Sequence, residues 1–425
     1  MFYIKEEQTV DRVILHVDMN NFFASVECAD RPELWTQPVA VAGDVQARHG
    51  IILAKNQVAK GFGVQTGESI AEARSKCHTL VLLPPHMDRY KQISDKARGI
   101  YARYTDRVES FGIDECWLDV TGNGMLWGQN FGVTIANEIR CAVKDELGVT
   151  VSVGVSFNKI FAKMGSDYKK PDAVTAVTRE NFRELLWGLP VEDLIFVGRS
   201  TAQKLWYMQI RTVGDLARAD PSLLESALGK SGLQAWQFAN GMDGSPVLCD
   251  GQAYPVKSIG NSTTTPVDMV TRRDAEIVLA QLCQSVATRL READLRCTTV
   301  KLALRSTDLS WKQRQKGTTA TCLETDLWRE AMTLYDTFHD GKPLRSIGVC
   351  ACNLVENGER QLGMFDLEGE SYHRAALESL GGVLDGLRAR YGARAVRRGL
   401  LLEGDALIDG IPPQGSLPHP VAWRK

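Results

Sequence analysis

The chain has 425 residues, 44% hydrophobic and 24% charged, with ten cysteines and a formal net charge of −2. Its length exceeds what one hydrophobic core supports, so two to four domains are expected. The composition excludes a disordered chain, and no apolar run approaches the roughly 18 residues of a membrane span. The scattered cysteines predict reduced core thiols and disfavour a zinc site. The start, MFYIKEEQTVDR, has no apolar signal segment, so we expect a cytoplasmic protein without a membrane partner.

The first 160 residues alternate between strand and helix patterns. Strand patterns occur at residues 13–17, 38–43, 50–56 and 149–156. Apolar side chains recur at helical spacing over residues 86–104 and 135–147. The alternation predicts an α+β domain.

The segment FGIDECWLDVTG, residues 111–122, combines strand-forming residues with acids. Asp114 and Glu115 are adjacent, and side chains alternate between the faces of a straight strand. Both can therefore serve one site only near a turn, for which Gly112 is suitably placed. Asp18 ends the strand predicted over 13–17, far away in the sequence. If the three acids converge, they suit two-metal phosphoryl transfer, because buried carboxylates need a neutralising cation; solvated strand-end acids are the alternative.

The second half of the chain has a different character. Short helical patterns fill residues 191–244, and a polar stretch with Gly and Pro over 243–257 is typical of a linker. A helix is predicted over 273–290 and an alternating strand over 298–307. From residue 257 to 316 there are eleven Lys/Arg against six Asp/Glu. Basic side chains on the solvent face of a sheet suit phosphate contact, which favours nucleic-acid binding.

Four segments resemble the signature segments of the Y-family DNA polymerases, the translesion group. They are HVDMNNFFASVE, FGIDECWLDVTG, SVGVSFNKIFAKMGSDYKKPDA and KSIGNSTTT, in the family's order across about residues 12–366. The resemblance implies an α+β multidomain fold, the polymerase right hand of palm, fingers and thumb with an added little finger domain. The expected parts are palm 1–30 and 78–187, fingers 31–77, thumb 188–245, linker 246–256, little finger 257–355 and a tail 356–425.

The resemblance also implies the activity, a template-directed DNA polymerase of low fidelity without proofreading. Its partners would be primer-template DNA and deoxyribonucleoside triphosphates, and it would act as a monomer. Asp18 and Asp114 would bind two Mg²⁺ ions with help from the Met19 carbonyl, and Glu115 would complete the site beside the primer 3′-hydroxyl.

Nucleotide contacts follow from the same resemblance. The resemblance implies that Phe22 and Phe23 contact the nucleotide. Phe23 stands at the steric-gate position, where a ring excludes a 2′-hydroxyl, although a simple core role is the alternative. Lys170 matches the lysine that contacts the triphosphate. Lys159 and Lys163 precede it and are also compatible with a solvated helix face.

Four positions depart from the family pattern. Asn20 replaces a second acid, and Gly112 replaces a serine before the Ile-Asp-Glu turn. Gln57 and Lys60 stand where a tyrosine and an arginine usually grip the triphosphate. Loss of an aromatic hydroxyl and a bidentate guanidinium predicts weaker nucleotide binding.

Residues 194–217 are similar to the helix-hairpin-helix of the family's thumb, in which peptide N–H groups bind backbone phosphates. Gly198 keeps one of the two hairpin glycines and Phe196 takes the place of the other, and a purely structural hairpin is the alternative. The residues expected to contact DNA are Gly198, Lys257, Arg305, Lys312 and Arg314.

The segment ERQLGMFD follows the predicted little finger. Gln361, Leu362, Met364 and Phe365 resemble the pentapeptide by which bacterial polymerases dock on the sliding β clamp. Two other functions remain open: a non-catalytic accessory protein that binds DNA and the clamp, and a two-metal nuclease.

Overall fold

A computed structural model describes residues 12–44, 48, 50–124, 130–249, 252, 255–356 and 368–408. They form two compact units, the first from residues 12–42 and 52–252 and the second from the remaining described residues. Within the described ranges no helix has the length and apolar character needed to cross a bilayer. The clamp-like residues Gln361, Leu362, Met364 and Phe365 lie outside the described residues.

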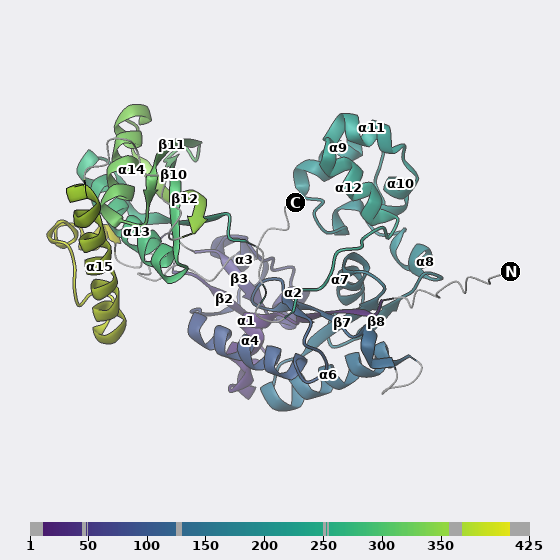
Figure 1. The fold of residues 1–425 in the computed structure, drawn as a ribbon. Helices are drawn as coiled ribbons and strands as arrows, with labels where there is room; N and C mark the ends of the chain where they lie inside the picture. Colours follow the sequence, from purple (N-terminus) through teal and green to yellow (C-terminus); the bar gives the residue numbers. More distant parts are fainter. Residues whose placement is uncertain are drawn as a thin grey trace. The chain divides into compact units, whose positions relative to one another are not determined.

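A five-stranded sheet forms the centre of the first unit. Its order is β5 (Val108–Ser110), β6 (Glu115–Asp119), β1 (Ile14–Met19), β7 (Val151–Ser156) and β8 (Val174–Val177). The central strands β1 and β7 are buried along their whole length because helices cover both faces. On one face lie α4 (Met87–Tyr101) and α6 (Phe131–Leu147), and on the other lies α7 (Lys159–Tyr168) (Figure 1). The strands and helices predicted here are confirmed, with β1 reaching Met19, one residue beyond Asp18.

A smaller sheet and the helix after β1 complete the N-terminal part. The sheet has the order β3 (Ile52–Lys55), β2 (Val39–Ala42) and β4 (Val81–Leu83). The helices are α1 (Phe22–Ala29), α2 (Gln57–Gly61) and α3 (Ile70–Lys76), with short 3-10 turns η1 (Pro32–Leu34) and η2 (Thr121–Asn123). Ser69 and Glu72 form a capping box at α3, which satisfies the free N–H groups of its first turn.

Short helices follow, as the sequence predicts. They are α8 (Phe182–Leu186), η3 (Val191–Asp193), α9 (Arg199–Tyr207), α10 (Val213–Arg218), α11 (Pro221–Leu228) and α12 (Lys230–Ala239). The stretch predicted as a linker packs against the first unit at its N-terminal end. Val247 is buried, and the carbonyl of Pro246 accepts a hydrogen bond from Lys159 in α7.

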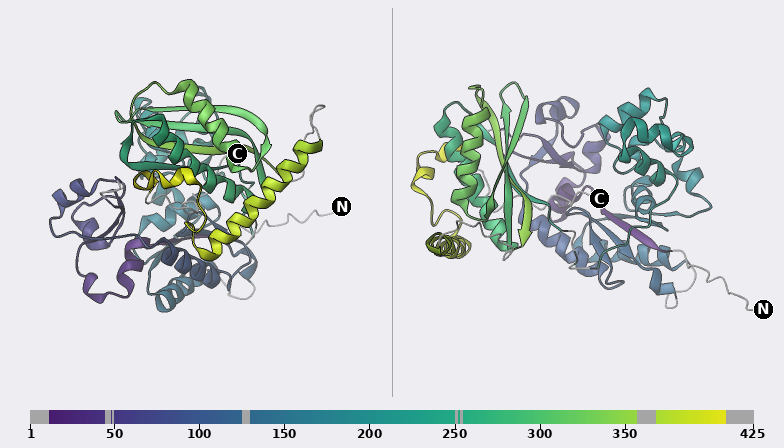
Figure 2. Two further views of the ribbon diagram at one scale, coloured as in Figure 1. Left: turned by 90° about the vertical axis from the view of Figure 1, so that its left-hand side faces the viewer. Right: turned by 45° about the horizontal axis from the view of Figure 1, so that its top comes forward.

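The second unit is a four-stranded antiparallel sheet covered by helices on one face. Its order is β11 (Trp311–Thr321), β10 (Leu295–Ser306), β12 (Leu344–Glu356) and β9 (Ser258–Met269). The covering helices are α13 (Arg272–Glu292) and α14 (Glu324–Phe338) (Figure 2). Val300, Leu302 and Leu304 are buried beneath them, whereas Lys301 and Arg305 point to the uncovered side, as the alternation predicts. We call this uncovered side the open face.

The C-terminal segment belongs to the same unit. It contains α15 (Glu368–Tyr391), η4 (Gly399–Leu402) and α16 (Asp405–Ile408), of which Leu401 and Ile408 join the buried core. Arg291 of α13 pairs with Asp385 at 2.7 Å. The core of this unit therefore extends past residue 356, where the sequence suggested that a tail begins.

Candidate active site

Strand register brings the predicted acids together. β1 runs antiparallel to β6 with Asp18 opposite Glu115, so both side chains point to one face. Asp114 lies just before β6 in a turn that Gly112 permits with a φ of 95°, and its carbonyl accepts a hydrogen bond from Met19 N at 3.0 Å. Asp18 is only 5% exposed. The turn inferred from the sequence is confirmed, and the solvated-acid alternative is wrong for Asp18.

Buried negative charge dominates the electrostatics of this group. Burial raises the pKa of Asp18, and the neighbouring Glu115 adds to the effect. Burial, followed by Glu115 and Asp18, raises the pKa of Asp114 to about 7. A hard divalent cation binds carboxylate oxygens and neutralises buried carboxylates that repel one another. The residues present therefore fit Mg²⁺.

Two lysines partly neutralise the acids. Lys163 Nζ lies 2.7 Å from Glu115 Oε2, and Lys170 Nζ lies 2.7 Å from both Asp18 Oδ2 and Asp167 Oδ1. Burial opposes the charge on Lys163 and Lys170, but the surrounding carboxylates raise the pKa of both amines. Both are therefore charged at neutral pH.

The solvated helix face, given as the alternative for Lys159 and Lys163, is wrong for both residues. Lys163 is 15% exposed and faces the acids, and Lys159 is completely buried against Glu109 at 2.6 Å. Lys159 also lies over the ring of Trp117, 4.6 Å from its centroid. Helical periodicity marks lysines as solvent-facing. It could not predict that these two face acids of the sheet on which α7 packs.

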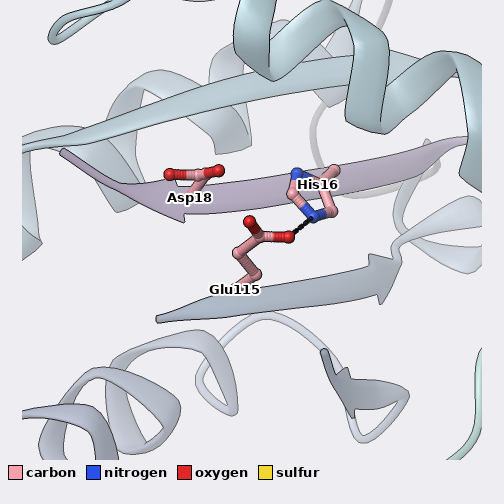
Figure 3. A group of neighbouring side chains, drawn as sticks. All are labelled: His16, Asp18 and Glu115. Atoms are coloured by element: carbon pink, nitrogen blue, oxygen red, sulfur yellow. Dashed lines mark ion pairs between the residues drawn. The ribbon is translucent and has the colours of Figure 1, made fainter. Parts of the chain in front are cut away.

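His16 joins the acids, which sequence analysis did not foresee. His16, Asp18 and Glu115 offer ligand atoms within 4.8 Å of one another (Figure 3). Ser166 donates its hydroxyl proton to the Lys163 carbonyl, so it accepts from His16 Nδ1 at 2.8 Å. The other ring nitrogen, Nε2, then carries a lone pair and faces Glu115 Oε2 at 3.3 Å. Burial lowers the pKa of His16, in keeping with a neutral ring.

Asn20 has a structural task. Its Nδ2 donates to Ser152 Oγ at 2.9 Å, and its Oδ1 accepts from Thr150 Oγ1 and from the backbone N–H of Asp172. These bonds tie β1 to β7 and to the loop that carries Lys170. Asn20, which stands in place of a second acid, thus helps to hold the loop of Lys170 against the sheet.

The steric-gate candidate lies on a second aromatic ring. Phe23 stacks on Tyr90 of α4 with centroids 4.2 Å apart and planes inclined by 11°. The Tyr90 hydroxyl donates to the buried Glu27 carboxylate at 2.6 Å, which fixes the supporting ring. Phe22 is 3% exposed and packs in the core, so the expectation that its side chain contacts nucleotide is not supported by its position.

Three other predicted contact residues stand on α2 and at the start of α9. Gln57 and Lys60 are exposed on α2. Asn56 caps the N-terminus of this helix: its side chain accepts a hydrogen bond from the backbone N–H of Ala59. Gly198 is the N-cap of α9, and the nearby Phe196 adopts a φ of 70°, the left-handed conformation that favours glycine. The hairpin keeps a glycine-like backbone despite the substitution.

The predicted DNA contacts of the second unit divide between two faces. Arg305 pairs in register with Trp311 on the open face, and its guanidinium lies over that ring. Lys312 and Arg314 lie opposite Leu304 and Leu302, on the side covered by helices, although both are exposed at the edge strand. The sequence grouped these residues together because alternation in β11 cannot by itself say which set faces the helices. Lys257 is exposed just before β9.

The sequence did contain signals for the missed residues. His16 lies two positions before Asp18 in a strand and so shares its face. Lys163 and Asp167 are four residues apart in α7, so they are neighbours on one side of that helix.

Comparison with known proteins points to one family. The impB/mucB/samB family matches residues 17–167, and the C-terminal domain of that family matches residues 256–364. The chain is 47% identical over 399 residues to DNA polymerase IV of Acetivibrio thermocellus, covering 93% of this chain and 99% of that protein. It is 36% identical to DNA polymerase IV 2 of Halalkalibacterium halodurans over 396 residues, which cover 92% of this chain and 95% of that protein.

A solved structure shares the fold. The Y-family DNA polymerase chimera Dbh-Dpo4(243-245)-Dbh matches with a TM-score of 0.73, covering 81% of this chain and all of that one at 21% identity. The fold is the polymerase right hand with an added little finger, built from the acid-bearing sheet, the helical segment and the four-stranded unit. The chain belongs to the impB/mucB/samB family of bacterial Y-family DNA polymerases.

Proposed function

We propose that the chain is a translesion DNA polymerase that adds deoxyribonucleotides to a primer 3′-hydroxyl by two-metal phosphoryl transfer, with low fidelity and without proofreading. The observation that carries the proposal is the pairing of Asp18 with Glu115 across β1 and β6, next to Asp114 in the adjoining turn and to two charged lysines. Two Mg²⁺ ions held by the three carboxylates and the Met19 carbonyl would stabilise charge on the attacking and leaving oxygens.

The chain's own residues prepare the site before any ligand arrives. Lys163 pairs with the Glu115 carboxylate at 2.7 Å and so orients it, while the neutral His16 ring lies beside the same carboxylate. Lys170 is paired with Asp18 and Asp167 and can exchange a carboxylate for a triphosphate oxygen. A cation at Asp18 and Asp114 would favour this exchange, because it relieves the repulsion that Lys170 partly compensates.

Selection of the sugar would fall to Phe23. Its ring stacks on Tyr90, and a hydrogen bond to Glu27 fixes Tyr90. The Phe23 ring therefore has little room to move away from a 2′-hydroxyl. Gln57 and Lys60 would contact the triphosphate from α2 more weakly than a tyrosine and an arginine would.

The second unit would hold primer-template DNA, together with Gly198 of the helical segment. Lys301 and Arg305 of the open face suit phosphate contact, which carries no sequence information and weakens with salt. Gln361, Leu362, Met364 and Phe365 would dock on the sliding clamp, and the polymerase would act as a monomer in the bacterial cytoplasm. A non-catalytic accessory role is disfavoured because the acids and Lys170 are all retained.

Primer extension tests the proposal. We expect extension by the wild type and a loss on the order of 10³-fold or more for Asp114→Ala, because removal of a preorganised charge from a buried site is costly. Asp95→Asn, an exposed carboxylate on α4 of the same unit, is the matched control and should extend normally. Extension by Asp114→Ala at the wild-type rate would refute the acidic site. Failure of every folded variant, wild type included, would favour the accessory role.

A further inference from the structure

Two cysteines adjoin one another on the open face of the second unit. Cys350 and Cys352 lie two residues apart in β12, and their sulfur atoms are 3.6 Å apart. Both are partly exposed, in contrast to the expectation that the chain's cysteines are core thiols. Such closeness makes the pair a dithiol.

The sheet leaves room for one of the sulfurs. Cys350 lies opposite Lys301 of β10 and Gly260 of β9. A Cβ atom at residue 260 would lie 2.9 Å from both Cβ and Sγ of Cys350. Only glycine therefore leaves this notch open, and the Cys350 sulfur occupies it.

The surroundings make the two thiols unequal. The hydrogen bond from the Cys352 thiol lowers the pKa of Cys350, against the effect of burial, and a hydrogen bond from Ser258 and the charges of Lys301 and Arg289 lower it further. The same hydrogen bond, together with burial and the charge on Cys350, raises the pKa of Cys352. Two other titratable groups act on Cys352 in opposite directions: the charge of Lys301 lowers its pKa, and Cys297 raises it. One partner is thus suited to be the thiolate nucleophile and the other the thiol that resolves it.

We propose that Cys350 and Cys352 form a redox-active dithiol whose oxidant is a hydroperoxide. The Cys350 thiolate attacks one peroxide oxygen, the O–O bond breaks, and the departing oxygen takes a proton to leave as alcohol or water. Cys350 is then a sulfenic acid. The Cys352 sulfur displaces its hydroxyl group, which leaves as water with the Cys352 proton, and an S–S bond forms.

The overall change is two thiols and one hydroperoxide giving one disulfide, water and an alcohol, or a second water from hydrogen peroxide. The sulfurs must approach from 3.6 Å to about 2.05 Å, which bends β12 locally beside Lys301. An effect of this bend on DNA affinity rests on the proposed function, whereas the thiol chemistry does not.

Kinetic peptide mapping of the full chain tests the dithiol. The reduced protein is treated with limiting hydrogen peroxide at about pH 6, quenched with iodoacetamide and analysed by mass spectrometry. Cys141, an exposed thiol on α6 of the other unit, is the internal control. We expect Cys350 to be consumed on the order of tenfold faster than Cys141, because the adjoining Cys352 thiol, Ser258 and the charges of Lys301 and Arg289 stabilise the Cys350 thiolate. The product should be a 350–352 disulfide that dithiothreitol reverses.

Two variants separate the roles. Cys352→Ser should accumulate a sulfenic acid on Cys350 that dimedone traps, and in Cys350→Ser the remaining Cys352 should react no faster than Cys141. Equal rates for Cys350 and Cys141 in the wild type, or oxidation of Cys350 without a disulfide, would overturn the proposal. A disulfide that forms without changing the affinity for primer-template DNA would establish the dithiol and instead count against DNA binding by the open face.

Discussion

The acid-bearing face of the first unit and the exposed edge strand β11 of the second unit use charge in opposite ways. In the first, charged side chains are buried and paired with one another, as in Lys159 with Glu109 at 2.6 Å. In the second, charges remain near water, as in Lys312 with Asp340, where both partners are at least a third exposed. Chemistry on a phosphate gains from desolvated, preorganised charge, whereas holding a DNA backbone gains from solvated charge that can exchange counterions. The same residue types should therefore matter very differently in the two units.

The largest difference is expected for stability. Lys159→Met leaves the Glu109 carboxylate buried with the N–H of Leu248 as a remaining donor, and should lower the free energy of unfolding by about 3–5 kcal/mol. The matched change Lys312→Met breaks an exposed pair and should cost less than about 1 kcal/mol. Urea unfolding followed by circular dichroism measures both. Equal losses for the two variants would remove the contrast.

The second prediction concerns pH and metal. The pKa of Asp114 is about 7 in the folded protein, and an ordinary aspartate titrates near 3.9, so the folded state binds this proton more tightly. The contribution of this group to stability is therefore present at low pH and is lost as the pH rises from about 4 to 7. Without metal at about pH 8, Asp114→Asn should be more stable than the wild type by on the order of 2 kcal/mol.

Thermal unfolding at about pH 5 and pH 8, with and without Mg²⁺, checks this prediction. The advantage of Asp114→Asn should shrink at the lower pH, and Mg²⁺ should stabilise the wild type more than the variant. Asp95→Asn should follow the wild type in every condition. A wild type that gains stability relative to Asp114→Asn as the pH rises without metal would show that the carboxylate is not destabilised by burial.

The third prediction tests which face of the second unit meets DNA. The double change Lys301→Gln with Arg305→Gln should lower affinity for primer-template DNA by about tenfold and reduce the salt slope by roughly 2, since two phosphate contacts are lost. The control pair Lys312→Gln with Lys316→Gln lies on the helix-covered side, where the lysines pair with Asp340 and Glu330, and should change both quantities less. Fluorescence anisotropy between about 50 and 200 mM salt measures this. Wild-type affinity that is flat over this range would remove the DNA assignment altogether.

The smallest effect is expected in the hairpin before α9. Phe196 is held at a φ of 70°, so Phe196→Gly should raise the stability by about 0.5–1 kcal/mol after the loss of ring contacts is included. Phe62 is a similarly exposed aromatic residue with an ordinary φ of −81°, and Phe62→Gly should be destabilising. Thermal denaturation distinguishes the two signs. Destabilisation by Phe196→Gly would mean that ring packing against Phe238 outweighs the backbone strain.

Much of the architecture could be predicted because it depends on local patterns. Alternation in β10 separated Val300, Leu302 and Leu304 from Lys301 and Arg305, and the structure has the same two faces. Helical spacing predicted α4 and α6 to within a few residues, although α6 begins four residues earlier. Gly112 marked the turn that lets two adjacent acids lie near one site.

Partners across the chain could not be predicted in this way. Whether Lys163 faces water or Glu115, and whether Lys312 shares a face with Arg305, depends on register and packing between segments far apart in sequence. By itself the sequence determined the strands, the turn at Gly112 and the surplus of basic residues, because backbone preference and side-chain periodicity act over a few residues. Only the tertiary structure decided which charge neutralises which, because the strength of an ion pair is set by distance and burial, and both exist only after the chain has folded.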